Sequence, residues 1–180
     1  MNGCSKYSRP YPNLKANAIL KNDIHVNEPY RSWQDPDSRP WISIAYDSIL
    51  NRYSNPTFQN AGYKGTFDGN NHTISNLCCI SEKSDNVGFF GKIGRQGTVK
   101  NLTIKNSYFS GVRGAHSAGL ICAQNIGKIE NCFVIMDLID LNQFPNTKSI
   151  AGYPVRRNSG RFDVYVYRPD NTPIIPRIQN

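Results

Sequence analysis

Acidic side chains are the residues of this chain that could carry out acid–base chemistry. The 180 residues include 13 Asp and Glu and 3 His. Hydrolysis of a glycosidic bond usually requires two carboxylates placed across a cleft. The acids closest to the repeated part of the chain do not cluster at one position; they are Asp68, Glu82, Asp85 and Glu130. We therefore predict that the chain is not an enzyme and has no catalytic residues. The alternative is a polysaccharide lyase or hydrolase of the parallel β-helix type.

Metal ligation is not indicated by the spacing of the histidines and cysteines. His25, His72 and His116 are far apart in the chain, and no Cys-x-x-Cys pair occurs. A cysteine in an apolar strand usually acts as a small hydrophobic residue. The five cysteines are Cys4, Cys78, Cys79, Cys122 and Cys132. We predict no metal site and no cofactor.

The net charge of +8 attracts polyanions, so a polyanion-binding domain is a further alternative. The basic residues are scattered, however, and only Arg156, Arg157 and Arg161 lie near one another. No nucleic-acid-binding motif accompanies them, so we expect no specific nucleic-acid partner. The sequence has no run of 18 apolar residues, and we expect no transmembrane segment.

A short pattern recurs in the middle of the chain and predicts repeated strands. The order polar, β-branched, polar, Asn, apolar occurs at 73–77, 98–102 and 128–132. The Asn residues of these segments are 25 and 30 residues apart. A weaker copy at 161–165 has Val in place of Asn. Repeats of this length are typical of solenoids, in which each unit stacks on its neighbour.

The apolar residues change face at the Asn of each copy. Ile74 and Leu77 have opposite parity, and the other two copies show the same change. Because side chains alternate along a strand, the buried face can change only at a bend. Asn adopts the left-handed conformation more readily than most residues and therefore suits a corner. We predict that Asn76, Asn101 and Asn131 lie one above another as a hydrogen-bonded ladder.

Segment 63–77 contains Phe-Asp-Gly-Asn-Asn and resembles the opening of the GLUG repeats of bacterial surface proteins. Other similar segments are 87–91 and 118–122 (the Gly-Leu-x-Gly core), 129–133 (the closing strand), and 18–24 and 41–44 (the lead-in). Cys122 stands where the second Gly of the core is usual. The resemblance implies a right-handed parallel β-helix of the kind found in exported adhesins and stalks, and it implies no catalytic residues.

Together these features predict an all-β fold, a short right-handed parallel β-helix (β-solenoid) of about four coils in a single domain. Its expected parts are an irregular lead-in (1–17), the first coil with a long aromatic loop (18–61), the core repeats (62–135), and the last coil with a Pro-rich tail (136–180). Within them we expect a turn at Asn22 and Asp23, a short helix around 45–52 and a last strand at 164–167.

Aromatic side chains near the first coil are the expected ligand contacts, because aromatic faces stack on sugar rings and basic groups pair with acidic ones. The predicted binding residues are Trp33, Trp41, Tyr46, Tyr63, Arg95 and Arg113. The alternative is that these aromatics only cover the first coil. We predict a non-enzymatic structural or adhesive module of a secreted or cell-surface bacterial protein, with a host or bacterial surface glycan or protein as its partner. Residues 1–10 lack the apolar core of a signal peptide.

Overall fold

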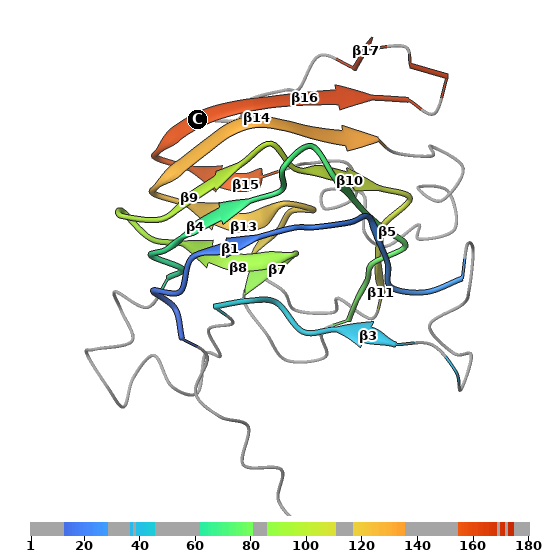
Figure 1. Cartoon of the computed structure of the whole chain (residues 1–180), viewed down its shortest axis with the longest axis horizontal. Coiled ribbons are helices and arrows are strands. Elements are labelled where there is room, and N and C mark those ends of the chain that lie inside the picture. Colours follow the sequence, from blue (N-terminus) through green and yellow to red (C-terminus); the bar gives the residue numbers. More distant parts are fainter. Residues whose placement is uncertain are drawn as a thin grey trace, which may run out of the picture.

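The computed structural model (Figure 1) describes residues 13–28, 37, 39–45, 62–80, 86–110, 117–135, 155–168, 170, 171, 173 and 174. Every regular element in these residues is a β-strand. No helix long and apolar enough to cross a membrane occurs in the described part of the chain. The strands are β1 (Ala18–Ile19), β2 (Ile24–His25), β3 (Pro40–Trp41), β4 (Thr66–Asp68), β5 (Thr73–Ser75), β6 (Cys78–Ile80), β7 (Asn86–Val87), β8 (Phe90–Ile93), β9 (Thr98–Lys100), β10 (Thr103–Lys105), β11 (Tyr108–Ser110), β12 (Ser117–Ala118), β13 (Cys122–Asn125), β14 (Lys128–Ile135), β15 (Val155–Asn158), β16 (Arg161–Tyr167) and β17 (Pro173–Ile174).

The largest sheet stacks strands from successive passes of the chain. Its order is β1-β4-β9-β14-β10-β5-β2, because the long β14 pairs with β9 through its first half and with β10 through its second half. Strand β16 lies on the other side of β14 (Figure 1). Phe67 pairs with Val99, Val99 with Ile129 and Ile129 with Phe162, so the chain returns to the same position after 30 to 33 residues.

Three smaller sheets repeat this stacking on the rest of each pass. Their strand orders are β11-β6-β3, β12-β7 and β15-β13-β8. All described strand pairs are parallel except β16 with β17. The all-β, parallel-stranded fold predicted from the sequence is confirmed, and the stacking is compatible with a β-solenoid.

The core consists of columns of apolar side chains that stack from layer to layer. Ile74, Ile104, Val134 and Val166 pair in register, and all four are buried. Within β14, Ile129 and Cys132 are both buried although they are three residues apart. The pairing with β16 shifts between these two residues. The predicted change of face at Asn131 is therefore confirmed.

Asn101 and Asn131 form part of a ladder at this corner. Both have positive φ, 51° and 49°. Asn131 Nδ2 donates to Asn101 Oδ1 at 2.9 Å, and Asn101 Nδ2 donates to Asp68 Oδ1 at 3.0 Å. On the far side, Asp163 Oδ2 accepts the backbone N–H of Asn131 at 3.2 Å. The ladder therefore runs Asp68–Asn101–Asn131–Asp163, with a carboxylate at each end.

The structure corrects the predicted position of Asn76. Strand β5 pairs with β10, which places Asn76 next to Asn106 at a second corner. There the Asn76 and Asn27 side chains each donate to the other residue's carbonyl oxygen, at 2.8 and 2.9 Å. The physical reason is that both corners require a left-handed residue, so both carry an Asn. In the layer of Asn76 the first corner is instead occupied by Asp68 and the glycine that follows it.

Four glycines occupy a third corner, just before the first strand of successive layers. Thr98 donates its backbone N–H to the Gly65 carbonyl, Lys128 to that of Gly97, and Arg161 to that of Gly127. Gly160 holds the same place one layer further on. Beside this column the buried Asn125 donates to Asn158 Oδ1 at 2.8 Å and accepts the Gly127 N–H at 3.0 Å. Neither this Asn pair nor the glycine column was predicted.

The remaining expectations have mixed outcomes. β1 and β2 flank the expected turn, but each pairs with the next layer and not with the other. The helix expected around 45–52 falls outside the described residues except for Ala45, whose φ is 56°. The strand at 164–167 is confirmed as the end of β16. Cys122 pairs with Phe90, so Ala123, and not Cys122, lies opposite Gly91.

Candidate binding surface

Trp41 and Tyr63 belong to a cluster of packed aromatic rings. Trp41 stacks on Phe89 at 5.0 Å between ring centroids, and Tyr63 lies 4.9 Å from Phe90. Phe89 and Phe90 are themselves in edge contact at 4.9 Å. Tyr63 is only 4% exposed, and its hydroxyl donates to the Ala16 carbonyl at 2.7 Å. Tyr63 therefore helps to build the core and offers no ring face to a ligand.

Trp41 is partly exposed, but its polar group is also engaged. Its indole Nε1 donates to the Phe89 carbonyl at 3.1 Å, which holds β3 against the next layer. Arg95 is exposed on the turn between β8 and β9. It follows Gly94, whose N–H donates to the Tyr63 carbonyl. Trp33, Tyr46 and Arg113 lie outside the described residues. The described members of the predicted set thus form no shared exposed surface.

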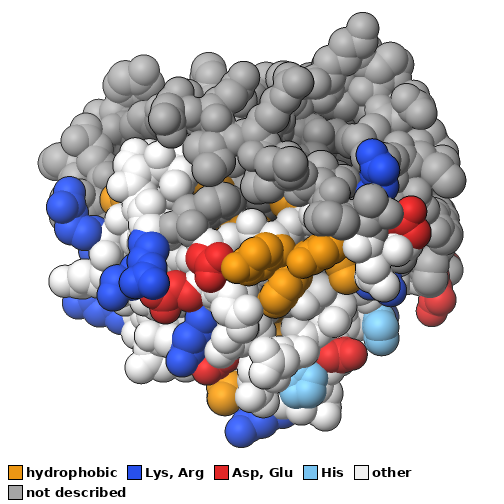
Figure 2. Space-filling model, turned by 90° about the horizontal axis from the view of Figure 1, so that it is seen from above, with side chains coloured by type: hydrophobic (Ala, Val, Ile, Leu, Met, Phe, Trp, Pro, Cys, Tyr) orange, Lys and Arg blue, Asp and Glu red, His pale blue; other side chains and the backbone are white. Residues whose placement is uncertain are grey.

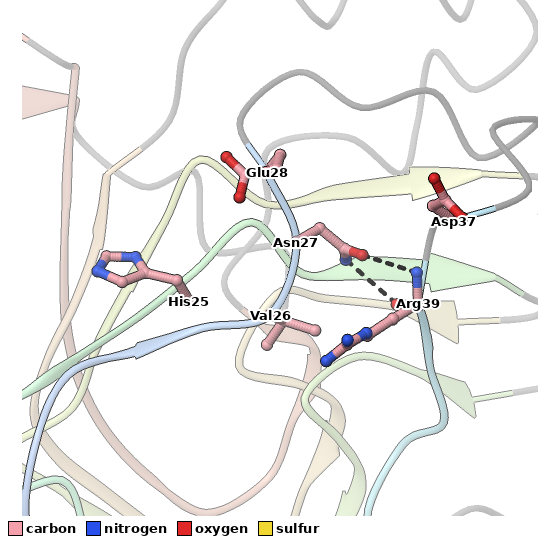
Figure 3. A pocket seen from close by; sticks show the side chains of 6 residues that line it. All are labelled: His25, Val26, Asn27, Glu28, Asp37 and Arg39. Atoms are coloured by element: carbon pink, nitrogen blue, oxygen red, sulfur yellow. Dashed lines mark hydrogen bonds between the residues drawn. The ribbon is translucent and has the colours of Figure 1, made fainter.

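A half-open hollow of about 540 Å³ lies at the second corner (Figure 3). Its lining residues are His25, Val26, Asn27, Glu28, Asp37 and Arg39. The side chain of Arg39 extends toward Val26, and Asn27 lies between the two segments (Figure 3). The volume is within the usual range of ligand pockets, which are mostly apolar. Among the described residues that line this hollow, Val26 alone is apolar.

Several polar groups of this hollow already have partners within the protein. Asn27 Oδ1 accepts the Arg39 N–H at 2.7 Å, and Asn27 Nδ2 donates to the Arg39 carbonyl at 3.1 Å. His25 Nδ1 and Ser75 Oγ are 2.6 Å apart. These bonds attach residues 25–27 and 39 to each other and to the neighbouring layer. The hollow is therefore first a structural junction, and its mixed charges favour neither an anion nor a cation.

A second surface is formed by aromatic rings on the outer side of β14 and β16. Phe133 pairs in register with Tyr165, and their rings stack at 5.4 Å with planes 22° apart. Tyr167 also stacks on Phe133, at 6.2 Å and 26°. Val164 and Val166 point into the core, so the two tyrosines between and after them point outward. Tyr165 is 47% exposed. We call Phe133, Tyr165 and Tyr167 the tyrosine platform.

Two ion pairs link side chains of neighbouring layers. Lys100 Nζ lies 3.2 Å from Asp68 Oδ2, and Arg161 Nε lies 3.5 Å from Glu130 Oε1. Seen from above, from the side of β16, the molecule shows an apolar patch with acidic and basic side chains around it (Figure 2). The Asp163 carboxylate raises the pKa of Tyr165, first through its charge and then through a hydrogen bond. This surface therefore combines exposed rings with polar groups.

The described cysteines lie in the core of the molecule. Cys78, Cys79, Cys122 and Cys132 are fully buried. Burial raises the pKa of the Cys132 thiol to about 12 and that of Cys122 well above its usual value. No group of three or more His, Cys, Asp or Glu that could hold a metal ion occurs among the described residues.

Sequence reasoning missed the tyrosine platform although a signal was present. The alternation Val-Tyr-Val-Tyr at 164–167 predicts one buried and one exposed face. Only the register with β14 shows that Phe133 lies beneath both tyrosines. The described part of the chain thus combines stacked parallel strands with aromatic side chains on the outer side of β14 and β16.

Comparison with known proteins finds that the chain is similar to a short part of a much longer protein. Over 116 residues, 63% of the chain, it is 31% identical to the protein named Halomucin of Haloquadratum walsbyi (strain DSM 16790 / HBSQ001). The match covers 1% of the length of Halomucin. No protein-family model matches the chain, and no solved structure matches it.

Proposed function

We propose that this chain is a non-catalytic structural and adhesive module of a secreted or cell-surface protein that binds glycan. In this proposal the module is a short right-handed parallel β-solenoid of about four coils, related to the GLUG-repeat proteins. The observation that carries the proposal is the Asp68–Asn101–Asn131 ladder, because it shows polar side chains used to hold one layer on the next. A protein built in this way is a scaffold whose outer side chains are available for contacts.

The use of the described acids supports a non-catalytic role. Asp68 is bound to Lys100 and Asn101, and Glu130 pairs with Arg161. Asp23 Oδ1 accepts the Thr73 N–H at 2.9 Å and lies 3.1 Å from His72 Nδ1. A general acid or base must be able to reach the proton that it transfers. These carboxylates are bound by backbone N–H groups at the corners and by side chains of neighbouring layers. Such contacts favour a structural role over acid–base catalysis.

The similarity to Halomucin supports a location outside the cell. It covers 63% of this chain and 1% of that protein, which is what a module within a long surface protein would give. The mixed surface charge suits contact with hydroxyl-rich glycans as well as with charged ones. The net charge of +8 alone does not decide between them.

The test is binding to a glycan array, with an activity assay on the same glycans. We expect the protein to bind at least one neutral or acidic glycan, and we expect no shortened or unsaturated product after long incubation. Ultraviolet absorbance of an unsaturated product would contradict the non-catalytic proposal. A blank array would contradict the adhesive role and leave a purely structural module.

A further inference from the structure

Tyr165 of the tyrosine platform is an exposed aromatic side chain of the described part of the chain. Both tyrosine rings lie within 26° of parallel to Phe133, which they contact from the same neighbouring strand. Because Phe133 occupies one side of each ring, the other faces of Tyr165 and Tyr167 point away from β14. The two tyrosines are alternate residues of one strand, so they are about 6.6 Å apart.

Tyr165 is the accessible half of the tyrosine platform. It is 47% exposed, whereas Tyr167 is partly buried. The antiparallel strand β17 pairs with Val166 and Tyr167 and with no described residue before them. The side of Tyr167 that faces away from β14 is thus bordered by Pro173 of β17, and a flat ligand can lie on Tyr165.

Polar groups at both ends of the tyrosine platform suit a ligand rich in hydroxyls. The Asp163 carboxylate is close to Tyr165 at one end, and the exposed Arg168 follows Tyr167 at the other. A carboxylate accepts hydrogen bonds from sugar hydroxyls, and a guanidinium donates to them. Arg161 is already paired with Glu130. An acidic sugar placed over Tyr165 would be repelled by Asp163, so the electrostatics favour a neutral ligand.

We propose that the tyrosine platform binds neutral, β-linked hexopyranose chains, with one sugar ring stacked on Tyr165 and the chain extending from it on the side away from β17. This rests on the glycan-binding part of the proposed function and names its site and its ligand class. Sugar rings whose hydrogens lie on one face present a flat apolar surface, and such a surface packs on an aromatic ring. Trp41 and Tyr63 take no part.

The test is a calorimetric titration of the whole chain with cellohexaose, and with an oligogalacturonate of the same length as the acidic comparison. The variants are Tyr165→Ala, which removes the ring, and Tyr165→Phe, which keeps it. The matched control is Ile19→Ala, because Ile19 is 49% exposed on β1, at the opposite side of the same sheet. A melting curve for each variant establishes that it is folded.

We expect cellohexaose to bind more tightly than the acidic oligomer. Tyr165→Ala should weaken binding about tenfold, Tyr165→Phe less than about threefold, and Ile19→Ala not measurably. Unchanged affinity of Tyr165→Ala, or a preference for the acidic oligomer, overturns the inference. If the array shows glycan binding that Tyr165→Ala leaves intact, only this site is wrong. If neither the array nor the titration shows binding by the wild type, the adhesive function fails together with the site.

Discussion

Asn101 combines two tasks in one side chain. Its backbone has φ 51°, and its amide joins Asp68 in one layer to Asn131 in the next. Residues with a Cβ are strained in this conformation, and Asn is among the least strained. A side chain without the amide would remove the hydrogen bonds between the layers. A residue that is also strained at positive φ would lower the stability of the fold further.

Two substitutions at Asn101 separate these tasks. Asn101→Gly keeps the left-handed backbone and removes the hydrogen bonds, so we expect a loss of about 1–3 kcal/mol in the free energy of unfolding. Asn101→Ala also adds backbone strain and should cost about 1 kcal/mol more. Urea unfolding of both variants measures the difference. Equal stability of the wild type and Asn101→Ala would show that the ladder contributes nothing.

Asp68 should make stability depend on pH. Burial opposes its ionisation, but hydrogen bonds from the Asn70 N–H and the Asn101 amide, together with Lys100, outweigh this and hold its pKa below 3.8. A lowered pKa in the folded state contributes stability that is present above pH 3.8 and is lost as the pH falls through the folded pKa. Asp68→Asn should therefore be less stable than the wild type at pH 7, by less than about 1 kcal/mol because the pair is partly exposed.

At pH 3 this difference between Asp68→Asn and the wild type should be smaller. Urea unfolding of both proteins at the two pH values measures it. A gap that stays constant, or that widens toward low pH, would show that the Asp68 carboxylate is not what Lys100 and Asn101 stabilise. Lys100→Gln is the matched control, because it removes the cation and leaves the carboxylate in place.

At the scale of elements, the strands were easier to predict than their stacking. Alternation and β-branched residues indicate strands at 73–75, 98–100 and 128–130, and the structure has strands there. The stacking of the first of these was misassigned, since Thr-Ile-x-Asn occurs at both 73–76 and 103–106. A single sequence shows that a corner exists, but which corner it is depends on contacts between layers.

The glycine column gives a prediction for the third corner. A Cβ at Gly97 would collide with the backbone carbonyl oxygen of Tyr63 in the preceding layer, whereas a Cβ at Gly94 would have 3.2 Å to the same atom. Backbone atoms that are tied into a ladder cannot easily move. We expect Gly97→Ala to lower the free energy of unfolding by about 2 kcal/mol and therefore to lower the melting temperature. Gly94→Ala should lower both by less. The reverse order in thermal unfolding would contradict the packing described for this corner.

At the scale of the whole molecule, the buried cysteines report on the integrity of the stack. Cys78, Cys79, Cys122 and Cys132 have no exposed surface, and burial raises the pKa of the Cys79, Cys122 and Cys132 thiols. We expect iodoacetamide to modify these four only after unfolding, because the thiolate is the reactive form. Mass spectrometry of native and urea-treated protein locates the modified residues. Rapid modification of Cys132 in the native protein would show that the layers separate there.

The candidate surface could be predicted less well than the scaffold. Trp41 and Tyr63 were chosen because exposed aromatics bind sugars, yet their rings fill space between layers. Residue type alone cannot distinguish the two uses, since both bury a ring against a flat partner. The tyrosine side chains of β16 point away from the core because they alternate with buried valines. This orientation could have been predicted from the alternation alone.

The in-register strands also show where the chain tolerates a change in length. Ile74, Ile104 and Val134 pair in register, and so do Phe90, Cys122 and Val155, yet the chain takes 16, 18 and 21 residues to run from the first set to the second. Shorter changes in length occur at the corners as well, because four residues separate β8 from β9 and two separate β13 from β14. A foreign peptide grafted between Ile80 and Asn86 would be displayed on a frame that its presence leaves unchanged.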